Sequence, residues 1–95
     1  MYAIAFDMVI SDLKIHYGEQ YHSAYSEIKK VMGENDFHWI QGSTYITEKS
    51  LIAVTMAMNA LNKIEWFRKS VRDIRAFRIE DWSDFTLMFK EDKGF

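Results

Sequence analysis

Bulky and small side chains alternate along the start of the chain, and this pattern constrains the fold more than any other feature of the sequence. Tyr2, Ile4, Phe6, Met8 and Ile10 alternate with Ala3, Ala5, Asp7 and Val9. A period of two residues predicts a β-strand from Tyr2 to Ile10, with its bulky face toward the helices. The small-residue face carries one carboxylate, Asp7, and a charge there belongs near an edge, in an ion pair or at a functional site.

Two later segments have the apolar spacing of helices. The first runs from Glu19 to Met32, between Gly18 and Gly33. The second runs to about Asn62, with Thr47 as its N-cap.

Extended segments and short turns occupy the rest of the chain. Phe37–Ile40 and Ser43–Thr47 are predicted to be two short extended segments joined through Gln41 and Gly42, either as a hairpin or as one bulged ribbon. Ile64–Ser70 is predicted to be a turn or short helix, and Val71–Glu80 a further strand. A short C-terminal helix capped by Ser83 is predicted over Phe85 and Met88. The order strand, helix, strand, strand, helix, strand predicts an α+β fold, the ferredoxin-like split βαβ arrangement. Its antiparallel sheet has helices on one face, and the open face is expected to pair with a second copy in a homodimer.

Length and composition predict one intracellular domain over residues 1–95, with a flexible tail at 90–95. The chain has no cysteine, which excludes disulfides, a thiol nucleophile and zinc sites built on thiolates, and favours the cytoplasm. No apolar run approaches the ~20 residues that cross a bilayer. The apolar N-terminus lacks the basic region and the cleavage site of a signal peptide.

Positive charge is concentrated in residues 63–78, which hold 6 basic and 2 acidic residues in a chain of net charge −2. Alternation in the strand predicts Asp73 and Arg75 on one face, with Arg72 and Arg78 on the other. Arginine suits phosphate because its planar fork donates two parallel hydrogen bonds. If this strand lies beside the first, Asp73 approaches Asp7. A solvated strand edge with internal ion pairs explains the same residues equally well.

The hairpin segment from Trp39 to Tyr45 offers aromatic rings, the Ser43 hydroxyl and a glycine that allows close backbone approach. Bases of RNA could stack there, although aromatic residues in strands more often belong to a core. The three histidines, His16, His22 and His38, are not expected to form a catalytic pair. The sequence contains no HxxxH, P-loop or GxGxxG motif.

Four segments resemble the virulence-associated protein D (VapD) family of bacteria: MYAIAFDMVI, WIQGSTYIT, MAMNALNKIEWF and SVRDIRAFRIEDWSDFT. The likeness spans Met1 to about Phe89. It implies a ferredoxin-like homodimer related in fold to small CRISPR-associated nucleases, with endoribonuclease activity. In some members it also implies a toxin role opposed by an antitoxin protein.

The resemblance places the family's functional residues on Asp7, Ser43 and Asp73, with Leu13 near the site. The leading hypothesis is cleavage of single-stranded RNA, including mRNA, by Asp7 acting as general base or as ligand of a divalent cation such as Mg²⁺. Asp73 and Ser43 would orient Asp7 or the substrate.

Arg72 and Arg75 would bind the substrate and stabilise charge that develops on its phosphate. One rival hypothesis is a non-catalytic module that binds RNA or protein through the same sheet. Another is a small-molecule regulatory domain, which would need a glycine-lined loop such as the one at Gly42.

Overall fold

A computed structural model describes residues 1–90, and the tail predicted at 90–95 therefore lies, apart from Lys90, outside the described residues. The elements in chain order are β1 (Tyr2–Met8), α1 (Ile10–His16), α2 (His22–Glu34), β2 (His38–Gln41), β3 (Thr44–Thr47), α3 (Leu51–Asn62), α4 (Glu65–Ser70), β4 (Val71–Arg78) and α5 (Thr86–Lys90). No helix within these residues has both the length and the apolar character needed to cross a bilayer.

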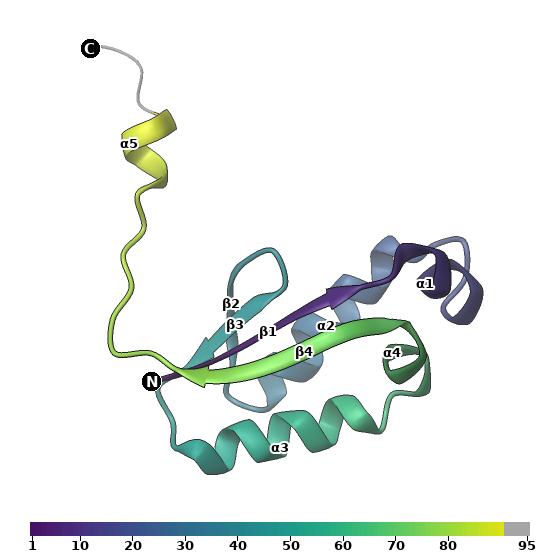
Figure 1. Ribbon diagram of the computed structural model, residues 1–95, viewed down its shortest axis with the longest axis horizontal. Coiled ribbons are helices and arrows are strands. Elements are labelled where there is room, and N and C mark those ends of the chain that lie inside the picture. Colours follow the sequence, from purple (N-terminus) through teal and green to yellow (C-terminus); the bar gives the residue numbers. More distant parts are fainter. Residues whose placement is uncertain (91–95) are drawn as a thin grey trace.

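The four strands form one antiparallel sheet in the order β2-β3-β1-β4. Helices α2 and α3 lie against one face of it, as Figure 1 shows. This arrangement confirms the predicted α+β, ferredoxin-like fold. The bulky face of β1 meets the helices as expected, and the core it helps to form contains Ile4, Phe6, Ile28, Met32, Phe37, Tyr45, Val54, Ala57, Leu61 and Phe67.

The first strand is shorter than the alternating pattern suggests. β1 ends at Met8, and Ile10 opens helix α1, which the sequence did not predict. The Val9 carbonyl accepts a hydrogen bond from the N–H of Leu13 at 2.9 Å, so the backbone has already turned into a helix there. The strand was predicted to run to Ile10 because alternation over two further residues does not distinguish the end of a strand from the first turn of a helix.

Both long helices begin later than predicted. Helix α2 starts at His22 and continues through Gly33, which therefore does not end it. Helix α3 starts at Leu51 with Ser50 at the N-cap position, so the assignment of Thr47 as N-cap is wrong. Thr47 is the buried last residue of β3, and its hydroxyl accepts a hydrogen bond from the N–H of Lys49 at 3.1 Å.

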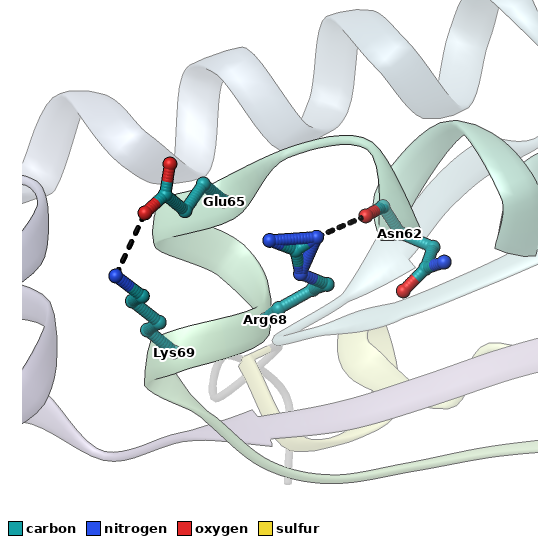
Figure 2. A network of polar contacts seen from close by, with 4 residues as sticks. All are labelled: Asn62, Glu65, Arg68 and Lys69. Carbon is teal, nitrogen blue, oxygen red and sulfur yellow. Dashed lines mark hydrogen bonds and ion pairs between the residues drawn. The ribbon is translucent and has the colours of Figure 1, made fainter.

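Helix α4 lies between α3 and β4 in the chain, and Figure 2 shows its polar contacts with the end of α3 and within its own turn. Arg68 donates a hydrogen bond to the Asn62 carbonyl at 3.1 Å, which places a cation at the C-terminus of α3. Lys69 pairs with Glu65 one turn earlier, at 2.7 Å, and this contact lowers the pKa of Glu65. Arg68 and Lys69, two of the basic residues that precede β4, therefore already have partners, in α3 and in α4 respectively.

The C-terminal segment leaves the sheet after Arg78, and α5 stands apart from the body of the molecule in Figure 1. Asp84 accepts a hydrogen bond from the N–H of Thr86 at 2.8 Å, so Asp84 rather than Ser83 caps this helix. We refer to residues 79–90 as the C-terminal arm. Its large apolar side chains are exposed: Trp82, Phe85, Leu87, Met88 and Phe89.

Candidate active site

The carboxylates of Asp7 and Asp73 belong to residues that are direct partners in the sheet. Asp7 lies near the end of β1, Asp73 lies near the start of β4, and the two strands pair in antiparallel register. Side chains of such a pair leave the same face with Cβ atoms about 4.5–5.5 Å apart. The prediction that Asp73 approaches Asp7 is confirmed, and the shared face is the one that the helices leave open.

A β-bulge brings Arg72 to the same place. Asp7 pairs with Asp73, but Met8 pairs with Val71, so Arg72 is an extra residue in β4. The Arg72 guanidinium lies 3.4 Å from Asp7, measured from Nη2 to Oδ2, and its Nε lies 3.9 Å from Oδ2 of Asp73. The expectation that Arg72 points away from Asp73 is therefore wrong, because the bulge interrupts the alternation on which it rested.

Arg75 completes a group of four charged residues, which we call the Asp7 cluster: Asp7, Arg72, Asp73 and Arg75. Its Nη1 atom lies 3.2 Å from Oδ1 of Asp73. The cluster is accessible to solvent, since Asp73, its least exposed side chain, is still 39% exposed. Exposed ion pairs contribute only about 0–1 kcal/mol each. A phosphate group can therefore compete for either guanidinium at little cost.

The cluster contains the groups that phosphodiester cleavage needs. A carboxylate can accept a proton or bind a cation, and a guanidinium can stabilise the negative charge that develops on phosphorus-bound oxygens. Within residues 1–90, no three His, Cys, Asp or Glu side chains group closely enough to hold a metal ion by themselves. Two adjacent carboxylates nevertheless suit Mg²⁺, which commonly takes one or two carboxylates and completes its shell with water and substrate phosphate.

Ser43 lies at the same end of the sheet as Asp7 but faces the other side. Its carbonyl accepts a hydrogen bond from the N–H of Phe6 at 3.2 Å, and the residue lines a cavity beside α2. Within residues 1–90, no hydrogen bond joins the Ser43 hydroxyl to Asp7 or Asp73. The structure thus brings together four of the residues singled out from the sequence, and Ser43 lies at a different surface.

Leu13 is fully buried in α1. Helix α1 packs against α4, the helix that leads into β4 and its bulge. A residue with no exposed surface cannot contact substrate directly in this conformation. The structure therefore places Leu13 in the packing between α1 and the rest of the domain rather than in the Asp7 cluster.

The cavity that Ser43 lines contains residues that the sequence analysis did not single out. It has a volume of about 450 Å³ and lies between α2 and the β2–β3 hairpin, lined by Tyr25, Ser26, Lys29, Trp39, Gly42, Ser43 and Tyr45. Tyr25 and Lys29 are four residues apart and so share one face of α2. That spacing was the available signal, but only the fold shows that this face lies against Trp39.

His38 is exposed on the open face, where it pairs with Ile46 of β3. Ile46 in turn pairs with Ala3, four residues along β1 from Asp7. At about 3.3 Å per residue, this offset places His38 more than 10 Å from the Asp7 cluster. Histidine at this position is therefore too far away to exchange protons with Asp7.

The chain matches known proteins over nearly its whole length. Residues 1–87 match the family model described as CRISPR associated protein Cas2. The chain is 55% identical over 91 residues to the Endoribonuclease VapD of Dichelobacter nodosus, covering 95% of this chain and 98% of that protein. It is 50% identical over 93 residues to the Endoribonuclease VapD of Helicobacter pylori, covering 95% and 99%.

The Endoribonuclease VapD of Haemophilus influenzae is 46% identical over 87 residues, covering 90% of this chain and 94% of that protein. Both the family match and these relatives extend over nearly the whole chain, including β1, the hairpin and β4. The chain therefore belongs to the VapD family, within the group that the Cas2 family model describes.

Proposed function

We propose that this chain is an endoribonuclease that cleaves single-stranded RNA at the Asp7 cluster. The observation that carries the proposal is the pairing of Asp7 with Asp73 beside two arginines on an exposed sheet face. The chain also shares 55% identity over 91 residues with a protein named as an endoribonuclease. This function accounts for a group of charges that contributes little to stability.

Within the cluster, the proposal assigns the reacting group to Asp7. Its side chain is 64% exposed against 39% for Asp73, so a substrate reaches it more easily. Asp73 holds Arg75 and the Nε edge of Arg72, and it therefore orients the cations. Arg72 would turn from Asp7 to the phosphate when RNA binds and would stabilise the charge of the transition state.

Two reaction routes use these groups and leave different products. In the first, Asp7 takes the proton of the RNA 2′-hydroxyl, the O2′–P bond forms and the P–O5′ bond breaks. The departing 5′-oxygen takes a proton from water, which leaves a 2′,3′-cyclic phosphate and a 5′-hydroxyl. In the second, Asp7 and Asp73 would help to hold Mg²⁺, which would supply an activated water for hydrolysis, and no cyclic product would form. Analysis of the RNA ends with and without EDTA separates the two routes.

The test of the activity is a cleavage assay on single-stranded RNA. We expect the parent chain to cut it and Asp7→Asn, which keeps the shape but removes the charge, to lose nearly all cleavage. Asp81→Asn, at an exposed position of the C-terminal arm, is the matched control and should cut normally. A folded Asp7→Asn protein that cuts at the parent rate would contradict the proposal. RNA that is bound but stays intact with the parent chain would favour a non-catalytic RNA-binding module.

The proposal includes a homodimer as the active form. On the open face Ala5 is half-buried and Phe77 is exposed, and the C-terminal arm adds the exposed aromatic side chains of Trp82, Phe85 and Phe89. A domain of this size buries only roughly 60–65% of the surface of its unfolded chain, so a second copy would supply burial that it lacks. A dimer would also carry two Asp7 clusters.

The proposal further places the reaction in the cytoplasm, with mRNA as substrate and an antitoxin protein as partner. The mRNA substrate and the antitoxin partner rest on the resemblance to the VapD family, and the cytoplasm is proposed because the chain has no cysteine. We expect induced expression of the parent chain in bacterial cells to slow growth and fragment mRNA, and expression of Asp7→Asn to do neither. Equal growth with both chains would argue against a toxin role.

A further inference from the structure

We propose that the cavity between α2 and the β2–β3 hairpin binds one unpaired nucleobase of the RNA substrate. This inference deepens the proposed function and rests on it. The cavity measures about 450 Å³, within the range of roughly 300–1,000 Å³ for small-molecule sites in proteins. It lies on the helix-covered side of the sheet, and the Asp7 cluster lies on the open side.

The lining of the cavity has the chemistry of a site for a base. Three aromatic rings contribute to it, those of Tyr25, Trp39 and Tyr45. A base can stack on such rings whatever its sequence identity. Two hydroxyl groups, of Ser26 and Ser43, can donate to or accept from the edge of the base. The phenol of Tyr45 is protonated at neutral pH because the ordinary tyrosine pKa is about 10, and burial raises that pKa further.

Trp39 is held in place before any ligand arrives. Trp39 is 47% exposed, so part of its ring is accessible to a ligand. Its indole N–H donates to the Gly42 carbonyl at 2.8 Å, and Gly42 itself has a φ of 49°, a conformation that favours glycine. A ring that is fixed in this way loses little conformational entropy when a base stacks on it.

A cation accompanies the ring. Nζ of Lys29 lies 5.3 Å from the centroid of the Trp39 ring. A stacked base would displace this ammonium group, and the flexible four-carbon stem of lysine allows it to move. The displaced ammonium would then be close to the phosphate of the same nucleotide. Aromatic stacking together with a cation is the usual combination for single-stranded nucleic acid.

Ser43, which lines the cavity, lies at the same end of the sheet as Asp7. The Ser43 carbonyl is hydrogen-bonded to the N–H of Phe6, the residue directly before Asp7. An RNA strand that curves around this end would place one base in the cavity and a neighbouring phosphate at the cluster. This path gives Ser43 a function as a base-binding residue, which agrees with the absence of any hydrogen bond from its hydroxyl to Asp7 or Asp73 within residues 1–90.

Binding can be tested without cleavage, using the four ribonucleoside 5′-monophosphates as probes. The NMR signal of the Trp39 indole N–H, assigned with Trp39→Phe, should shift saturably with at least one of them. Lys29→Ala should weaken this binding several-fold, whereas Lys30→Ala should not, because Lys30 has the same charge and helix but does not line the cavity. If the indole signal stays still with all four nucleotides, the inference is wrong.

Kinetics on RNA provide a second readout. Trp39→Ala should raise KM on the order of 10-fold, the effect expected from losing one stacked base, with kcat largely kept. Trp39→Phe should fall between the parent and Trp39→Ala because it retains a ring. A parent that cuts RNA while Trp39→Ala and Lys29→Ala have unchanged KM would refute the base site alone. A parent that binds mononucleotides at Trp39 but cuts no RNA would refute the nuclease proposal alone.

Discussion

Arg72 lies close to the carboxylates of both Asp7 and Asp73 and makes only a weak contact with each. Its contacts with Asp7 and Asp73 are 3.4 and 3.9 Å long, and its side chain is 64% exposed. Contacts of this length in water are weak and are exchanged readily for a better partner. A phosphodiester is such a partner, since it accepts two parallel hydrogen bonds from one guanidinium.

Arg72→Ala should therefore reduce the rate of RNA cleavage on the order of 100-fold, the usual loss when one group that stabilises the transition state is removed. Stability should change little because the ion pairs are exposed. Arg78→Ala is the control, since it removes the same charge from the other end of β4. Cleavage rates and urea unfolding of both variants give the comparison. Equal loss of activity in the two variants would mean that bulk charge, rather than position, is responsible.

Tyr45 predicts a dependence of stability on alkaline pH. Burial raises the pKa of its phenol in the folded state, so the folded chain holds that proton more tightly than the unfolded chain. The resulting stability is complete below the ordinary tyrosine pKa of about 10 and is lost as the pH rises through it toward the folded value. Tyr45→Phe should lose less stability than the parent between pH 9 and about 11. Parallel stability curves for the two proteins would contradict this expectation.

At the scale of elements, periodicity predicted the regular strands and helices but missed the bulge in β4 and the cavity at Trp39. Alternation identified β1 and β4, and helical spacing identified α2 and α3, because each buries a regular stripe against the core. The bulge at Arg72 could not be predicted from the alternation of residue types along β4, because polar residues near the end of a strand are exposed on either face. The cavity at Trp39 required the packing of α2 on the hairpin, which no local pattern encodes.

Leu13 tests the role of α1 in holding the site. Leu13→Ala should lower the free energy of unfolding by about 2–5 kcal/mol because it leaves a cavity in a fully buried position. Leu13→Met nearly conserves volume and should cost less than about 1.5 kcal/mol. Activity at a temperature where both variants are folded should follow this order. A stable Leu13→Met protein with no cleavage would instead assign Leu13 a part in the reaction itself.

The whole molecule is a small domain with an extended appendage, and this shape is typical of chains that assemble. The sheet and its helices form one body, and the C-terminal arm reaches away from it in Figure 1. Five large apolar side chains of the arm are exposed, a greater share than a stable monomer normally leaves in water. The proposed dimer follows from this imbalance.

Phe77→Asp should shift the chain from dimer to monomer, because Phe77 is 45% exposed on the open face. Ile52→Asp provides the control, since Ile52 is 73% exposed on α3, away from that face. Sedimentation equilibrium over a range of concentrations measures both. If the parent is a monomer at every concentration, or if the two variants dissociate equally, the open face is not the dimer interface.

The extra residue in β4, Arg72, places a cation beside Asp7. Because of this extra residue, Val71 pairs with Met8 and faces the opposite side of the sheet from Asp73, although simple alternation would put Val71 and Asp73 on the same side. A chain shortened by that one residue would keep nearly the same composition and the same alternating appearance, yet Asp7 would have no cation beside it. Arg72 therefore contributes to the site through its place as the extra residue of β4 as well as through its charge.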